Sequence, residues 1–175
     1  MSARMNSPWR RSWRAQPKAA AIADRHYNRQ KPGSPQFVPP GSCLALLTAD
    51  RSAVWVTSWP KAKFVQHAWA GAWVNSLFRL ERDPGEPGPL ASDLIRWAVA
   101  HTRARWPEVP ALGMVTFINP DKVRHKRDPG RCYRKAGFKV AGKTKGGLVV
   151  LQMTPDSMPS SEPIPGDQLT LWGVA

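Results

Sequence analysis

The chain has 175 residues, 42% of them hydrophobic, and this composition excludes an intrinsically disordered protein. Lys and Arg number 26 against 12 acidic residues, and the resulting net charge of +14 favours a polyanionic partner over a merely solvated basic surface. No apolar run approaches the roughly 20 residues that span a bilayer, and the basic N-terminus lacks the apolar stretch of a secretory signal. We therefore expect a cytoplasmic protein with no membrane contact, whose two cysteines, Cys43 and Cys132, are reduced thiols.

The first half of the chain predicts a short helix followed by strands. Residues 1–16 are basic and contain tryptophan, and we expect a loosely ordered arm there. Pro17 opens a helix that extends to about Tyr27, because proline is tolerated in a first helical turn. The Pro- and Gly-rich residues 31–41 predict an exposed loop. Alternating apolar residues at 43–50 and 52–59 predict an antiparallel hairpin, and residues 74–81 predict a third strand.

The second half predicts helices packed on further strands. After a Gly- and Pro-rich loop at 82–89, the apolar spacing over 90–106 predicts an amphipathic helix. The uninterrupted apolar run at 112–118 predicts a buried strand, and a short helix at 130–136 precedes strands at 138–142 and 146–153. The sequence thus predicts an α/β (α+β) domain over 17–153, with a mixed, mostly antiparallel sheet flanked by helices. Residues 154–167, rich in Pro and Ser, predict a flexible linker to a short C-terminal peptide, 168–175, in a disordered tail.

The order of these elements resembles the GNAT acyltransferase fold. Residues 132–138, Cys-Tyr-Arg-Lys-Ala-Gly-Phe, resemble the C-terminal Tyr-x-x-x-Gly-Phe segment of that fold, in which a short helix ends at a glycine in the left-handed conformation. GNAT enzymes bind the pyrophosphate of acetyl-CoA through the backbone N–H groups of a glycine-rich loop. Here residues 85–90 include two prolines, which lack that donor, and Asp83 and Glu86 add negative charge. Acetyl-CoA is therefore not the expected cofactor.

Residues 23–29, Ala-Asp-Arg-His-Tyr-Asn-Arg, with the proline-rich loop after them, resemble the bacteriophage Mom DNA-modification family. The resemblance covers about residues 17–153. In that family a His-Tyr pair near the N-terminus, and an aspartate and a tyrosine in the C-terminal part, are regarded as the active-site set. The resemblance implies His26, Tyr27, Asp128 and Tyr133 as catalytic residues, with Asp121 as the alternative carboxylate.

The same resemblance implies a reaction and a metal. The reaction is the transfer of a carbamoylmethyl-type group to the exocyclic amine of adenine in double-stranded DNA, an anti-restriction modification of phages. The metal is iron, for which the implied ligands are His26, Asp128 and Tyr133. The exocyclic amine is a poor nucleophile, so the reaction needs a base or an activated electrophile. A histidine suits either proton transfer or metal binding, and the sequence leaves both roles open.

Basic residues cluster beside these positions and predict contacts with DNA phosphates, which set affinity more than sequence preference. The predicted DNA-binding residues are Arg25, Arg29, Lys31, Lys122, Arg124, Lys126, Arg127 and Arg131. An enzyme that acts on a base in a duplex must extrude that base. The tryptophans Trp55, Trp59, Trp69 and Trp73 are candidates to receive it.

The C-terminal residues Gln168, Leu169, Thr170, Leu171 and Trp172 resemble the peptide by which bacterial replication and repair proteins bind the sliding clamp. In this interpretation Gln168 is the polar anchor, and Leu169, Leu171 and Trp172 are the apolar anchors. The alternative is a segment that folds back onto the domain. Two other functions also remain open: a GNAT-type acetyl- or aminoacyltransferase that acts on another modified base or a protein, and a non-catalytic DNA-binding protein.

Overall fold

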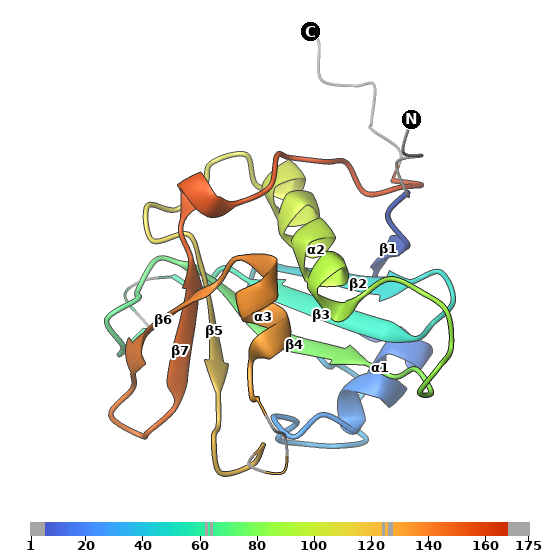
Figure 1. The fold of residues 1–175 in the computed structure, drawn as a ribbon, viewed down its shortest axis with the longest axis horizontal. Coiled ribbons are helices and arrows are strands. Elements are labelled where there is room, and N and C mark those ends of the chain that lie inside the picture. The colour runs from blue at the N-terminus through green and yellow to red at the C-terminus, as the bar shows by residue number, and fades with distance from the viewer. Residues whose placement is uncertain (1–5, 62, 64, 124, 126–127, 168–175) are drawn as a thin grey trace, which may run out of the picture.

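A computed structural model describes residues 6–61, 63, 65–123, 125 and 128–167. These residues form an α+β fold in which a seven-stranded sheet is flanked by three α-helices (Figure 1). The strands are β1 (Trp9–Ser12), β2 (Cys43–Thr48), β3 (Ala53–Ser58), β4 (Trp73–Leu80), β5 (Met114–Ile118), β6 (Lys139–Lys143) and β7 (Val149–Met153). The helices are α1 (Pro17–Asp24), α2 (Ala91–Arg105) and α3 (Arg131–Ala136).

The sheet is mixed and mostly antiparallel, as the sequence predicts. Its strand order is β1-β2-β3-β4-β5-β7-β6, and every neighbouring pair is antiparallel except β4 and β5, which are parallel. The predicted order of hairpin, strand, loop, long helix, buried strand, short helix and strand pair is confirmed. The short helix α3 ends at Gly137, whose φ of 113° lies in the left-handed region, as expected for a glycine at that position.

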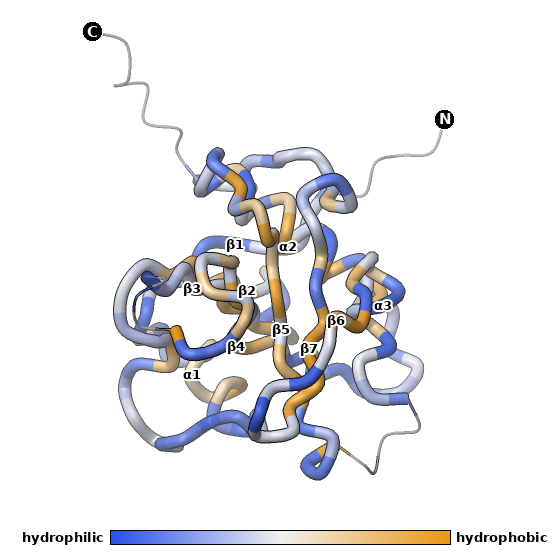
Figure 2. Tube along the Cα trace, turned by 90° about the vertical axis from the view of Figure 1, so that its left-hand side faces the viewer, coloured by the Kyte–Doolittle hydropathy of each residue, from blue (hydrophilic) through white to orange (hydrophobic). Residues whose placement is uncertain are grey.

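The central strand β3 shows how the sheet is covered on both faces. All six of its residues are buried. Trp55 belongs to the cluster that packs against α2, whereas Val54 and Val56 belong to the cluster that contains Ile22 of α1. Because successive strand residues point to opposite faces, an apolar strand without alternation needs cover on each side. Figure 2 shows apolar residues concentrated along the strands and hydrophilic residues along the loops.

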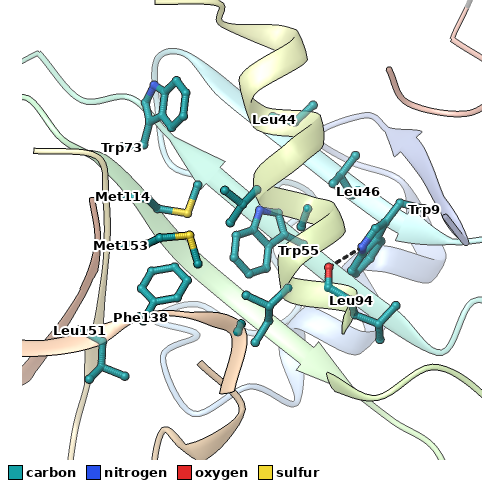
Figure 3. Packing of buried hydrophobic residues seen from close by; sticks show 14 of the residues in the cluster. Trp9, Leu44, Leu46, Trp55, Trp73, Leu94, Met114, Phe138, Leu151 and Met153 are labelled. Carbon is teal, nitrogen blue, oxygen red and sulfur yellow. Dashed lines mark hydrogen bonds between the residues drawn. The ribbon is translucent and has the colours of Figure 1, made fainter. Parts of the chain in front are cut away.

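The N-terminal segment is a strand of the sheet, so the expectation of a loosely ordered arm is wrong for its described part. β1 pairs with β2 over four residues, and Trp9 is completely buried. The Trp9 indole N–H donates to the Leu94 carbonyl oxygen of α2 at 2.8 Å (Figure 3). Burial of so large a side chain supplies the free energy that holds a short edge strand on the sheet. By contrast, Trp13, just after β1, is 63% exposed.

The segment after β7 is packed, so the expectation of a flexible linker over 154–167 is also wrong. It forms a short 3-10 helix (Pro155–Ser157) and then crosses above α2 toward β1 (Figure 1). Met158 and Ile164 are buried in the main core. The fully buried His101 of α2 joins this segment to the N-terminus: its Nδ1 donates to the Glu162 carbonyl oxygen, and its Nε2 contacts Ser7 Oγ, each at 2.7 Å.

No helix in the described part of the chain is both long enough and apolar enough to span a bilayer.

Candidate functional site

The main cavity lies where the two parallel strands separate. β4 and β5 pair only over residues 73–75 and 114–116, and beyond that point they run in different directions (Figure 1). A cavity of about 520 Å³ occupies the space between them. This volume falls in the range of roughly 300–1,000 Å³ that is typical of small-molecule sites. Its lining comes from residues 25–28 after α1, 75–80 of β4, 116–118 of β5 and the first turn of α3, and from residues 122, 123, 125, 129 and 130 between β5 and α3.

Three of the four predicted catalytic residues, His26, Tyr27 and Tyr133, line this cavity. They come from opposite ends of the domain, and only the tertiary structure brings them together. Tyr133 is positioned by α3, whose first turn packs tightly on the sheet. A Cβ atom at Gly130, the residue before α3, would lie 2.6 Å from Ile118 Cδ1, and its φ of 78° also favours glycine. A side chain at position 130 would force the ends of the Ile118 and Leu151 side chains to move, in addition to the strain of a positive φ.

A buried hydrogen-bond network surrounds the Tyr133 hydroxyl. Tyr133 Oη lies 2.6 Å from Asn75 Oδ1, and Thr116 Oγ1 lies 3.2 Å from both the carbonyl oxygen and Oδ1 of Asn75. Asn75 is only 3% exposed, so its polar atoms depend on these partners. Burial raises the pKa of Tyr133 well above its ordinary value of 10, which keeps the phenol protonated at neutral pH.

A bulge in β4 lies beside this network. Asn75 pairs with Thr57 and Leu77 pairs with Val56, so Ser76 is the extra residue between them. Ser76 lines the cavity, and its buried hydroxyl has no hydrogen-bond partner among the described residues. A polar atom of this kind is available to a bound molecule.

His26 and Tyr27 form another wall of the cavity. Their rings stack with centroids 4.6 Å apart and planes inclined by 25°. The Asn28 backbone N–H donates to His26 Nδ1 at 3.1 Å, so the neutral imidazole carries its proton on Nε2. Burial raises the pKa of Tyr27, which therefore also stays protonated at neutral pH.

Two arginines and a glutamate form an ion-pair network on the cavity wall. Arg25 Nε donates to Glu81 Oε1 at 2.7 Å, and Arg79 Nε donates to the same oxygen at 2.6 Å. Hydrogen bonds from Arg25 and Arg79 lower the pKa of Glu81 from 4.5 to about 2. Both arginines line the cavity, and the single carboxylate leaves one net positive charge. This part of the cavity favours an anionic group.

The two predicted carboxylates lie outside the cavity lining. Asp128 is exposed and pairs with Arg134 of α3, and Asp121 is exposed in the loop after β5. Neither is among the residues that line the cavity. The structure therefore joins His26, Tyr27 and Tyr133 but not the aspartate.

The implied iron ligands do not fit that metal. Asp128 is paired with Arg134 outside the cavity lining, and the Tyr133 hydroxyl donates to Asn75, so these two oxygens are not presented together with His26 to one metal ion. Within the described ranges, no three His, Cys, Asp or Glu side chains lie close enough together to hold a metal ion.

The predicted DNA-binding residues occupy different environments. Arg25 and Lys122 line the cavity, and Lys31 and Arg131 are exposed. Arg29 has a structural role: its guanidinium pairs with Asp24 at 2.7 Å, donates to the Ser34 carbonyl oxygen and is 11% exposed. The positions Arg124, Lys126 and Arg127 lie outside the described residues, as do the predicted clamp-binding residues Gln168, Leu169, Leu171 and Trp172.

The loop before α2 has few backbone donors for a pyrophosphate. Its prolines at 84, 87 and 89 have no N–H, and the Glu86 N–H already donates to the Asp83 carbonyl oxygen. Arg82 is a basic residue of this loop that the sequence pattern did not single out, and its guanidinium donates to the Pro89 carbonyl oxygen at 2.8 Å. A Cβ atom at Gly88 would lie 2.5 Å from Arg82 Cζ, so the side chain fills the space above the loop.

The tryptophan candidates for a flipped base are not in the cavity. Trp55 and Trp73 are completely buried in the core, and neither Trp59 nor Trp69 lines the cavity. Its aromatic lining is instead His26, Tyr27, Phe78, Phe117, His125 and Tyr133. Sequence reasoning missed Asn75, Arg79 and Glu81 as site residues. Two of them, Asn75 and Arg79, do interrupt the apolar pattern of a predicted strand, and this was the available signal.

Comparison with known proteins finds no match to this chain among family models, curated proteins or solved structures.

Proposed function

We propose that the protein is a transferase that modifies the exocyclic amine of adenine in DNA, with the cavity between β4 and β5 as its active site. The observation that carries this proposal is the convergence of His26, Tyr27 and Tyr133 on one cavity. These three residues belong to two short motifs that lie far apart in the sequence, and each motif is identified by its residue types alone.

The shape and charge of the cavity suit an extruded nucleotide. Its volume of about 520 Å³ has room for a purine, and its aromatic lining offers faces on which a base can stack. Arg25, Arg79 and Lys122 supply positive charge where the phosphates flanking that base would lie. The net charge of +14 supports the same class of partner.

The transfer itself needs an activated donor, such as a carbamoylmethyl group that bears a leaving group. The adenine amine forms a bond from nitrogen to the electrophilic carbon, and the donor's leaving group departs with the electron pair of the broken bond. The amine loses one proton, which passes to water or to the His125 imidazole, because the Nδ1 lone pair of neutral His26 already accepts from the Asn28 N–H. The protein contributes orientation of the two reactants and exclusion of bulk water. Tyr27 and Tyr133 are protonated and therefore orient groups instead of accepting the proton.

The deciding experiment is mass spectrometry of nucleosides from bacterial DNA after expression of the protein. We expect a new deoxyadenosine derivative with wild type and none with His26→Ala or Tyr133→Phe. Both variants should bind ordinary duplex within a few-fold of wild type, because phosphate contacts supply most of that affinity. Trp13→Ala is the matched control, since this exposed side chain lies outside the cavity lining.

Other outcomes would favour the other functions. Altered cytosine or thymine beside unaltered adenine would assign a different base. Acetylated protein with no altered nucleoside would favour an acetyltransferase. DNA binding with neither product would favour a non-catalytic DNA-binding protein.

A further inference from the structure

The orientation of the Asn75 amide is determined by its surroundings. Its Nδ2 lies 3.0 Å from the Val56 carbonyl oxygen and 2.9 Å from the Leu77 carbonyl oxygen. Carbonyl oxygens only accept hydrogen bonds, so the amide nitrogen must face them and the amide oxygen must face the other way. The reversed amide would place its oxygen against two carbonyl oxygens, an arrangement of acceptors that forms no hydrogen bond. Asn75 Oδ1 therefore points toward Tyr133 and Thr116 as an acceptor.

This orientation also determines the hydrogen bonding of Tyr133. At 2.6 Å from an acceptor, the Tyr133 O–H must donate to Asn75 Oδ1. A phenol has one proton, so the oxygen retains only its lone pairs for any other partner. A molecule in the cavity that contacts this oxygen meets a hydrogen-bond acceptor.

From this polarity, and resting on the function proposed above, we infer that Tyr133 is a specificity-determining residue. Its oxygen accepts a hydrogen bond from the exocyclic amine of the target base, and it selects a base with an amino group over one with an oxo group at the same position. Asn75 is the positioning residue that sets this polarity, because it takes up the only proton of the phenol.

Adenine and hypoxanthine test this selection directly. They differ at carbon 6, where adenine has an amino group that donates and hypoxanthine has an oxygen that accepts, and at nitrogen 1, which accepts in adenine and donates in hypoxanthine. The Tyr133→Phe variant isolates the contribution of carbon 6 that depends on the tyrosine oxygen. Against the Tyr133 oxygen, adenine forms a hydrogen bond, whereas hypoxanthine places two acceptors face to face. The difference should amount to about three- to tenfold in affinity. Because burial keeps Tyr133 protonated to high pH, the preference should be constant between about pH 6 and 9.

The experiment measures binding to two short duplexes that differ only in the target base, adenine or hypoxanthine, placed opposite an abasic site. The abasic site lowers the cost of extruding the base, and raised salt weakens the phosphate contacts that both duplexes share. The measured quantity is the ratio of the two dissociation constants by fluorescence anisotropy. Wild type should prefer adenine by about three- to tenfold, and Tyr133→Phe should bind both about equally.

Two further variants separate this role from a structural one. Trp13→Ala changes an exposed side chain outside the cavity lining and should keep the preference for adenine. Asn75→Ala releases the Tyr133 proton, so the preference should fall even though the tyrosine remains. A thermal melt shows whether Asn75→Ala folds. If it does not, Tyr133→Phe decides the question alone, because that variant loses only an oxygen atom.

Equal binding of the two duplexes by wild type, or a preference that persists in Tyr133→Phe, would overturn the inference. An affinity for the adenine duplex that is no higher than the affinity for a duplex without a target base would also overturn it. These results are distinct from failure of the proposed function. Adenine modification without this preference leaves the function in place and removes the role of Tyr133. A Tyr133-dependent preference without any modified nucleoside would keep the role of Tyr133 in base selection and remove the proposed transferase function.

Discussion

Replacement of Trp9 by alanine tests whether the N-terminal strand belongs to the core. Trp9 is completely buried among side chains of the main core, and its indole N–H is bonded to the Leu94 carbonyl oxygen at 2.8 Å. Removing a buried tryptophan side chain costs about 3–5 kcal/mol, through lost transfer free energy and the cavity left behind. Against a total stability of about 5–15 kcal/mol, such a loss is large. For a chain of this size it should lower the melting temperature by about 6–20 °C.

Two variants divide this effect into its parts. Trp9→Phe keeps most of the apolar volume but loses the indole N–H, so it should cost only about 1–2 kcal/mol. Trp13→Ala is the matched control in the same segment, because that side chain is 63% exposed, and it should change stability by less than about 0.5 kcal/mol. Urea denaturation gives the free energy of unfolding for each variant. If Trp9→Ala were no less stable than Trp13→Ala, the packing of β1 on α2 would be refuted.

Three further predictions concern pH and the C-terminus. Burial lowers the pKa of His101 below 6.5, so the neutral imidazole stabilises the fold fully above that pH and less as the pH falls below it. The melting temperatures of wild type and His101→Ala should therefore converge as the pH falls from 8 to 5. The pKa of Glu81 is lowered from 4.5 to about 2, so its stabilisation of about 1–2 kcal/mol, after allowance for solvent screening, should be lost as the pH falls from 4.5 to 2. In urea titrations the stability of Glu81→Gln should fall less than that of wild type over this range, because other carboxylates still titrate, and an equal fall in the two proteins would contradict the ion-pair network. Deletion of residues 168–175 should abolish capture by a purified bacterial sliding clamp without lowering the melting temperature. Deletion of 158–175 should also destabilise the fold, by about 1.5–3 kcal/mol for each of the buried Met158 and Ile164. A lower melting temperature after the shorter deletion would favour a folded-back peptide.

Much of the fold follows from local patterns that the sequence displays directly. The hairpin of β2 and β3, the amphipathic α2 and the apolar β5 each carry their own periodicity, and Gly137 ends α3 where a left-handed residue was required. The two terminal segments differ from expectation for a physical reason. β1 and residues 154–167 have no periodicity of their own, and they are held by a few deep contacts, such as those of Trp9 and Ile164, with distant parts of the chain.

Some residues of the candidate site were also recognisable from the sequence, and others only from the structure. His26, Tyr27 and Tyr133 were recognisable from the sequence because a short motif displays its residue types directly. Asn75 and Glu81 acquire their roles only from neighbours that are remote in the sequence: the carbonyl oxygens that orient the Asn75 amide, and Arg25, which reaches Glu81 from beyond the end of α1. The local patterns of the sequence account for the elements that have their own periodicity and for the residue types of the candidate site. Only the tertiary structure decided which of them share a cavity and in what protonation state, because desolvation and hydrogen bonding arise from contacts between segments that meet on folding.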